Sequence, residues 1–219
     1  MVDGFVSRPG EWQIAPTDLF EFEPGQSLED IQAEYQNRLY VIMQDYLQGS
    51  EPITSYRNEF NRTVNDAFTM AFVAGWADAG ASALTDEAQS WLNGRIDQEV
   101  GFVESLFPQL KALRDDDEIP EDDKLDAAHA HAEGYTNTLM GVYAQGKMMG
   151  EPERDGEWEY GDTDHCDTCA DLNGQTHPLS WYLSNGYIPQ QAGSDTLDCH
   201  GYNCQCRIKN PKTGAQLIP

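Results

Sequence analysis

The sequence is short of basic residues. It has 13 Lys and Arg against 38 Asp and Glu, which gives a formal net charge of −25. The shortage runs along the whole chain: residues 1–150 carry nine basic and 27 acidic side chains, and residues 151–219 carry four and 11. Proteins that grip nucleic acid obtain much of their affinity from basic contacts to phosphate. We therefore expect no direct nucleic-acid binding, and an acidic, soluble protein whose free subunits repel one another.

Long apolar runs are also missing. No stretch approaches the ~18 apolar residues that a membrane span needs, so we expect no membrane association. Residues 1–10 lack the charged start and apolar run of a secretory signal, which predicts synthesis in the cytoplasm. A reducing cytoplasm and an odd number of cysteines, five, both disfavour a structural disulfide framework.

Cysteine is absent from the first 165 residues, and this absence divides the chain. We place a domain boundary at residues 150–156. Residues 27–150 form the expected helical domain, and residues 157–219 form the expected cysteine-rich module. Residues 1–26 are rich in Pro, Gly and aromatics without periodicity, and they predict an extended N-terminal arm.

Apolar residues at three- and four-residue steps predict four long helices in the helical domain. The first starts after Ser27 and ends at Gly49, the second starts near Ser55, the third starts after Thr85, and the fourth runs from about Pro120 to Met149. Pro108 is expected to kink or divide the third helix. Long helices with short connections predict an antiparallel bundle, so the fold class is mainly α with a small α+β, zinc-ribbon-like C-terminal module.

Turn residues dominate the C-terminal module, and its strand candidates are short: 157–160, 175–177 and 205–209. A module of this size with so few apolar residues is hard to hold together by burial alone. A further source of stability is therefore expected.

The cysteines supply a candidate. Cys166 and Cys169 form a Cys-x-x-Cys motif, and Cys199, Cys204 and Cys206 follow some 30 residues later. Two thiolate clusters at such a separation are typical of a structural zinc site. We favour Cys166, Cys169, Cys199 and Cys204 as ligands; Cys206 could replace one of the last two, and His200 is a further alternative.

The cysteine motif has three alternative roles: redox chemistry, disulfide formation and a catalytic zinc site. A redox motif needs a helix start in a βαβ context, whereas the sequence around Cys166 predicts a turn. Disulfides formed after release from the cell are another alternative. A catalytic zinc site usually has His and Glu ligands and one open position, and no such motif is present. We expect no enzyme activity and no catalytic residues.

One pattern in the C-terminal region combines a tryptophan, the Cys-x-x-Cys motif, a Leu-x-Gly step and a later Cys-x-Cys with a basic residue. Its members are Trp158, Cys166, Cys169, Leu172, Gly174, Cys204, Cys206 and Arg207. With this pattern the region resembles the phage head morphogenesis proteins, the Mu F-like minor head family, over about 75 residues. The family often has His-Pro-x-Cys-x-Cys where this chain has Gly-Tyr-Asn-Cys-Gln-Cys.

The resemblance implies a bacteriophage virion protein with a structural role. Such a minor head protein would bind the portal or the major capsid protein in the phage head, after assembly in the bacterial cytoplasm. A capsid decoration or cement protein is the alternative, and a zinc-dependent nuclease is the hypothesis from another class.

Overall fold

The computed structural model describes residues 26–161, 166–201 and 204–218. The predicted arm lies outside these residues, apart from Gln26. Five long helices dominate the described part, which confirms the mainly α fold with a small cysteine-rich α+β region. The helices are α1 (Leu28–Gln48), α2 (Arg57–Asp78), α3 (Asp86–Asp115), α4 (Glu121–Thr136) and α5 (Thr138–Gly150), with a short 3-10 turn, η1 (Ile53–Ser55), before α2.

Two helix starts follow directly from their capping residues. Ser27 accepts a hydrogen bond from the backbone N–H of Asp30, whose carboxylate in turn accepts from the Ser27 N–H. Thr85 accepts from the N–H of Ala88 at 3.1 Å. Each side chain satisfies a backbone donor that the first helical turn leaves unpaired, and both starts are those predicted.

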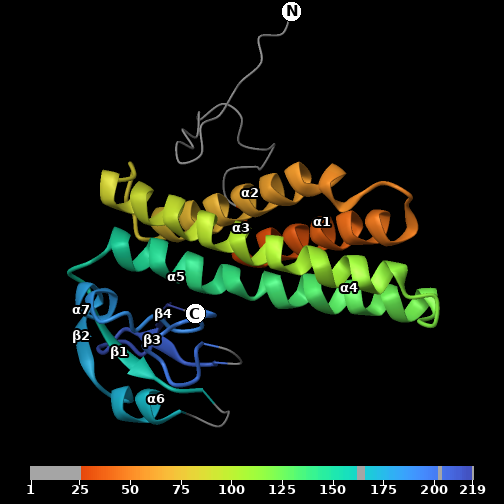
Figure 1. Ribbon diagram of the computed structural model, residues 1–219. Helices are drawn as coiled ribbons and strands as arrows, with labels where there is room; N and C mark the ends of the chain where they lie inside the picture. The colour runs from red at the N-terminus through yellow and green to blue at the C-terminus, as the bar shows by residue number, and fades with distance from the viewer. Residues whose placement is uncertain (1–25, 162–165, 202–203, 219) are drawn as a thin grey trace, which may run out of the picture.

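The helices pack as a bundle in which α5 lies on α2 and α4 lies on α1 (Figure 1). The predicted stripes supply a continuous core that includes Tyr35, Phe68 and Leu110. Burial of these faces is the main source of helix stability in such a fold.

One prediction about helix continuity was wrong. The single helix expected from about Pro120 to Met149 is two helices, α4 and α5, separated at Asn137. The hydroxyl groups of Thr136 and Thr138 donate to the carbonyls of Ala132 and Tyr135, and such bonds compete with the backbone ladder. Of the two outcomes expected at Pro108, a kink or a division, the division is absent, since α3 continues to Asp115.

Glycines allow α2 and α5 to approach closely. A Cβ atom at Gly75 would overlap the carbonyl oxygen of Tyr143, and one at Gly146 would overlap the carbonyl oxygen of Phe72. The close packing predicted around Gly75 is therefore present. The predicted break after it is present too, because α2 ends at Asp78 and Gly80 adopts a φ of +78°.

The C-terminal module is a four-stranded antiparallel sheet with two short helices. Its strands lie in the order β2-β1-β3-β4. The three predicted strands are present with shifted bounds, whereas β4 and both helices were not predicted. The elements are β1 (Asp155–Glu159), α6 (Asp167–Leu172), β2 (Thr176–Pro178), α7 (Leu179–Ser184), β3 (Arg207–Lys209) and β4 (Gln216–Ile218).

Helix α5 contributes to two hydrophobic cores. Leu139, Val142 and Tyr143 belong to the bundle core. Ala144 and Met148 belong to a second core, together with Trp158 and Tyr182 of the module. Figure 1 shows the module beneath α5, where α7 and β4 contact that helix. The module thus borrows apolar surface from the bundle.

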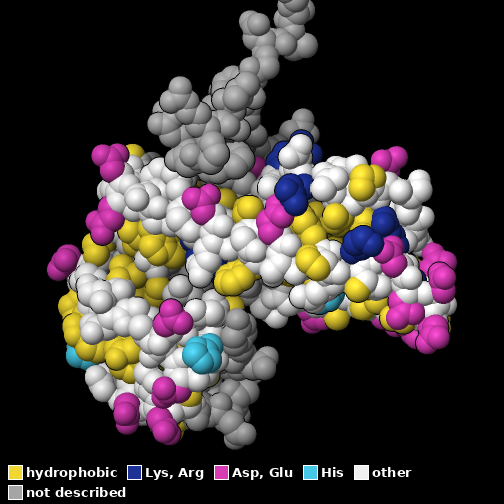
Figure 2. Space-filling view, in the orientation of Figure 1, with side chains coloured by type: hydrophobic (Ala, Val, Ile, Leu, Met, Phe, Trp, Pro, Cys, Tyr) yellow, Lys and Arg dark blue, Asp and Glu magenta, His cyan; other side chains and the backbone are white. Residues whose placement is uncertain are grey.

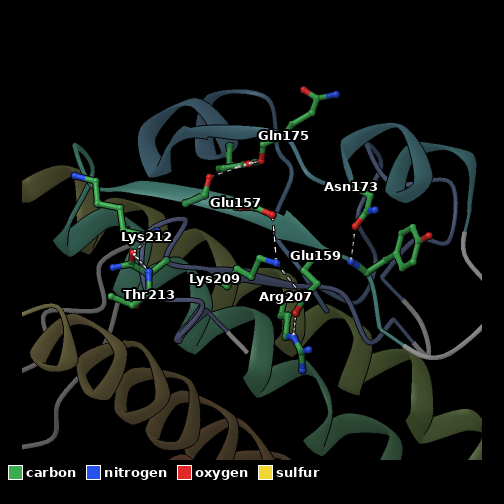
Figure 3. A network of polar contacts seen from close by, with 12 residues as sticks. Glu157, Glu159, Asn173, Gln175, Arg207, Lys209, Lys212 and Thr213 are labelled. Atoms are coloured by element: carbon green, nitrogen blue, oxygen red, sulfur yellow. Dashed lines mark hydrogen bonds and ion pairs between the residues drawn. The ribbon is translucent and has the colours of Figure 1, made fainter.

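Cross-strand ion pairs cover one part of the sheet. Lys209 of β3 lies between Glu157 and Glu159 of β1, at 3.2 and 2.9 Å, and Arg207 pairs with Glu159 (Figure 3). Lys209 and Arg207 donate hydrogen bonds that hold the pKa of Glu159 below its usual range. These pairs fix the register between β1 and β3.

Acidic side chains are spread over the visible face of the molecule, and basic ones gather in a few small groups (Figure 2). None of the helices that the structure describes is long and apolar enough to cross a membrane.

Candidate metal centre

The Cys-x-x-Cys motif lies at the start of a helix. Cys166 is the N-cap residue of α6, and Cys169 lies in its first turn. The sulfur of Cys166 accepts a hydrogen bond from the Cys169 N–H at 3.4 Å. The predicted turn was therefore wrong at this point. The surrounding sheet is antiparallel, so the βαβ context of a redox motif is still missing.

The segment that carries the later cysteines contacts α6. Cys199 follows Asp198, whose carboxylate accepts from the N–H of Thr168 at 3.0 Å and from its hydroxyl at 2.6 Å. This Thr168–Asp198 contact joins the first turn of α6 to the segment that carries Cys199. Cys204 and Cys206 directly precede β3.

Five sulfur atoms thereby form two overlapping groups. Cys166, Cys169 and Cys199 have their sulfurs within 4.8 Å of one another, and so do Cys169, Cys204 and Cys206. Cys169 belongs to both groups. All five are free thiols. Every predicted ligand lies in one of the two groups, but the favoured set Cys166, Cys169, Cys199 and Cys204 is divided between them, and Cys206 is grouped with Cys204.

The cluster fits a thiophilic metal ion. Four thiolates 2.3 Å from a tetrahedral ion lie about 3.8 Å from one another, which is compatible with the spacing within each group. Cys169 and Cys206 are buried, and the other three are partly buried. A cluster of soft, shielded sulfur donors could hold a metal ion.

The thiols also perturb one another. Cys169 and Cys206 donate hydrogen bonds to the sulfur of Cys204 and lower its pKa, and the same contact with Cys204 raises the pKa of Cys169. Burial would raise the pKa of Cys166, but hydrogen bonds from Cys169 and Cys199 outweigh it and lower the value.

Histidines contribute to neither sulfur group among the described residues. The Nδ1 atom of His200 lies 2.9 Å from the carbonyl oxygen of Ser194. His177 stacks on Trp181 with ring centroids 3.7 Å apart and contacts Gln175 through Nε2. His165 lies outside the described residues.

Sequence reasoning missed the residues that position the cluster. Asp198 is one, and its signal was an acidic residue directly before a cysteine. Gly201 is another: its φ is +71°, and a Cβ there would overlap the carbonyl oxygen of Gln191. Both hold the segment between the two sulfur groups in place.

Comparison with known proteins adds no further assignment. No family model matches the chain, no curated protein matches it significantly in sequence, and no solved structure matches it significantly.

Proposed function

We propose that this chain is a structural and assembly component of a phage head, a minor head protein that binds the portal or the major capsid protein. The observation that supports this most is where the residues of the resemblance fall in the fold. Trp158 is fully buried, Leu172 and Cys169 lie in the same core, and Arg207 pairs with Glu159 across the sheet. These residues stabilise the fold of the module. A structural protein that binds its partners through its surface needs such a stable fold.

The acidic surface agrees with this role. With a net charge of −25, the protein would be repelled by DNA during packaging and would not compete for it. Its contacts would then be with other proteins of the particle.

A structural Zn²⁺ would complete the module in this proposal. Four of the five cysteines would bind it, since tetrahedral sites with only cysteine ligands are common where zinc has a structural role. Zinc would be bound inside the cell, where thiols stay reduced.

The nuclease hypothesis finds less support. A hydrolytic zinc site needs an open coordination position and a general base. Among the described residues, both candidate ligand groups contain cysteines alone.

The test of the virion role is quantitative mass spectrometry of purified particles of the phage that encodes this chain. We expect a few to a dozen copies per particle, and binding of the purified chain to the portal or the major capsid protein. Hundreds of copies would indicate a decoration protein. Absence from particles would overturn the virion role, and DNA cleavage by the purified protein that is lost in His177→Ala would establish the nuclease.

The test of the metal is separate. Elemental analysis of protein made and purified under reducing conditions should find about one zinc per chain, and Cys169→Ser should abolish it because Cys169 belongs to both sulfur groups. Protein without metal, with two disulfides in mature particles, would overturn the zinc proposal and leave the virion role standing.

A further inference from the structure

A cavity of about 760 Å³ lies where the bundle meets the C-terminal module. This volume is in the range of small-ligand sites. Figure 1 shows the module close to the point where α4 passes into α5. Three parts of the chain line the cavity: α3 with Glu99 and Phe102, the α4–α5 junction with Gly134 and Tyr135, and the module with Gln190.

One wall of the cavity holds a buried carboxylate whose acceptor capacity is only partly used. The Glu99 side chain is 1% exposed, and Arg95, one turn away, is its ion-pair partner with Nη2 3.2 Å from Oε2. Neither Glu99 oxygen accepts a well-aligned hydrogen bond from the described residues. Burial raises the pKa of Glu99 to about 7, against the lowering effect of Arg95. A buried carboxylate with so few donors is costly, so a further donor at this wall would stabilise it.

The guanidinium of Arg95, by contrast, already has several partners. It donates to the Gln98 side chain at 3.0 Å, and it lies over the Phe68 ring at 5.4 Å from the centroid. Of the two charged groups in this wall, it is therefore the Glu99 carboxylate that can still accept hydrogen bonds. This disfavours an anionic ligand, as does the net charge of −25.

Part of the cavity lining is apolar, beside polar residues such as Ser105 and Asn137. Phe102, one turn of α3 beyond Glu99, is 45% exposed and lines the cavity together with Met140. An aromatic ring at the rim favours a ligand whose charged head is carried on an aliphatic stem.

We propose that this cavity binds an organic cation whose ammonium or guanidinium head donates hydrogen bonds to Glu99 and whose stem lies against Phe102. Such a cation has two sources: a free polyamine-like metabolite, or a Lys or Arg side chain of a partner protein. Both present the same head group. Cys204 of the second sulfur group also lines the cavity, but the proposal rests on Glu99 and Phe102 and not on a metal.

Titration calorimetry of the full chain with agmatine, which carries a guanidinium and an ammonium on an aliphatic stem, tests the proposal. Gly134→Leu should weaken binding at least tenfold, because a Cβ at Gly134 has open space and the larger side chain would enter the cavity. Gly101→Leu is the matched control: it also lies in a helix with open space and does not line the cavity.

A second pair of variants tests the carboxylate itself. Glu99→Gln should also weaken agmatine binding at least tenfold, whereas Glu104→Gln, on the exposed Arg57 pair of the same helix, should leave it unchanged. If Glu99→Gln does not fold, the Gly134 pair decides alone.

A second probe, N-acetyl-arginine amide, distinguishes a free cation from the side chain of a partner protein. Tighter binding of agmatine than of N-acetyl-arginine amide assigns the cavity to a free cation, and the reverse order assigns it to a partner's side chain. Failure of both probes to bind at millimolar concentration, or equal binding by wild type and Gly134→Leu, would overturn the proposal.

Discussion

At the scale of single residues, the sulfur cluster depends on side chains that carry no sulfur. Asp198 is exposed, yet its two hydrogen bonds from Thr168 fix the segment of Cys199 against α6. The same bonds hold the pKa of Asp198 below its usual range. Groups that orient metal ligands commonly change affinity 10–100-fold when they are removed.

Asp198→Ala should therefore weaken zinc binding about tenfold, measured by competition with a colorimetric chelator. Asp195→Ala, at an exposed position three residues earlier, is the control and should bind as wild type does. Equal affinities for the two variants would show that the Thr168–Asp198 contact does not position the site.

Asp66 has the opposite electrostatic situation. It is buried on α2, its Oδ2 has no hydrogen-bond partner, and burial raises its pKa to about 6. Because the folded pKa lies above the ordinary value, the folded state holds this proton more tightly than the unfolded state. Stability from this group is present at low pH and is lost as the pH rises from about 4 through 6.

Asp66→Asn should remove this loss. We expect the free energy of unfolding to rise by roughly 1–2 kcal/mol at pH 8 and to change little at pH 4, as measured by urea denaturation. Asp97→Asn, at an exposed position on α3, should change neither value. A variant less stable than wild type at pH 8 would contradict the argument.

At the scale of elements, the sequence pattern predicted what local chemistry determines. The caps at Ser27 and Thr85 and the apolar stripes gave the starts of two helices and the faces they bury. Pattern alone did not separate α4 from α5, since the apolar stripe continues across Asn137, where the hydroxyls of Thr136 and Thr138 add bonds to backbone carbonyls. The short α6, α7 and β4 are set by tertiary pairing, which no local periodicity records.

The candidate site divides in the same way. The residue types and spacing of the cysteines predicted a sulfur cluster, because thiolate chemistry is read from composition. The way these cysteines divide into two groups was not predicted, since it involves contacts of Asp198 and Gly201 with partners further away in the sequence. The cavity beside Glu99 was not predicted, since it is built from three parts distant in the chain.

The α2–α5 contact gives an element-scale prediction. Gly146→Ala should lower the free energy of unfolding by several kcal/mol, because the added methyl group would overlap backbone that cannot move aside. Gly101→Ala, in a helix with open space around it, should raise it by about 0.5–1 kcal/mol through helix propensity. Thermal denaturation followed by circular dichroism compares them, and similar melting temperatures would refute the close-packing argument.

At the scale of the whole molecule, α5 couples the module to the bundle. Metal removal should loosen the module first, because its core is small and takes only Ala144 and Met148 from α5 among the described residues. In zinc-loaded protein treated with a chelator, hydrogen exchange should therefore accelerate by at least tenfold in residues 155–218, while α1 and α2 keep their protection. Uniform acceleration in all helices would show instead that the two cores unfold as one unit.

The pairing of α2 with α5 also sets an order of events on the ribosome. The face of α2 that carries Gly75 is complete when Asp78 has been made, but its partner α5 begins only at Thr138. At 5–20 residues per second, those roughly 60 residues take about 3–12 s to synthesise. During that interval the face of α2 that packs against α5 lacks this partner. Helices α3 and α4 must leave the ribosome without covering that face. The nascent chain is therefore most exposed to aggregation just before α5 appears, and a slow codon run within residues 79–137 would lengthen the interval that the fold tolerates least.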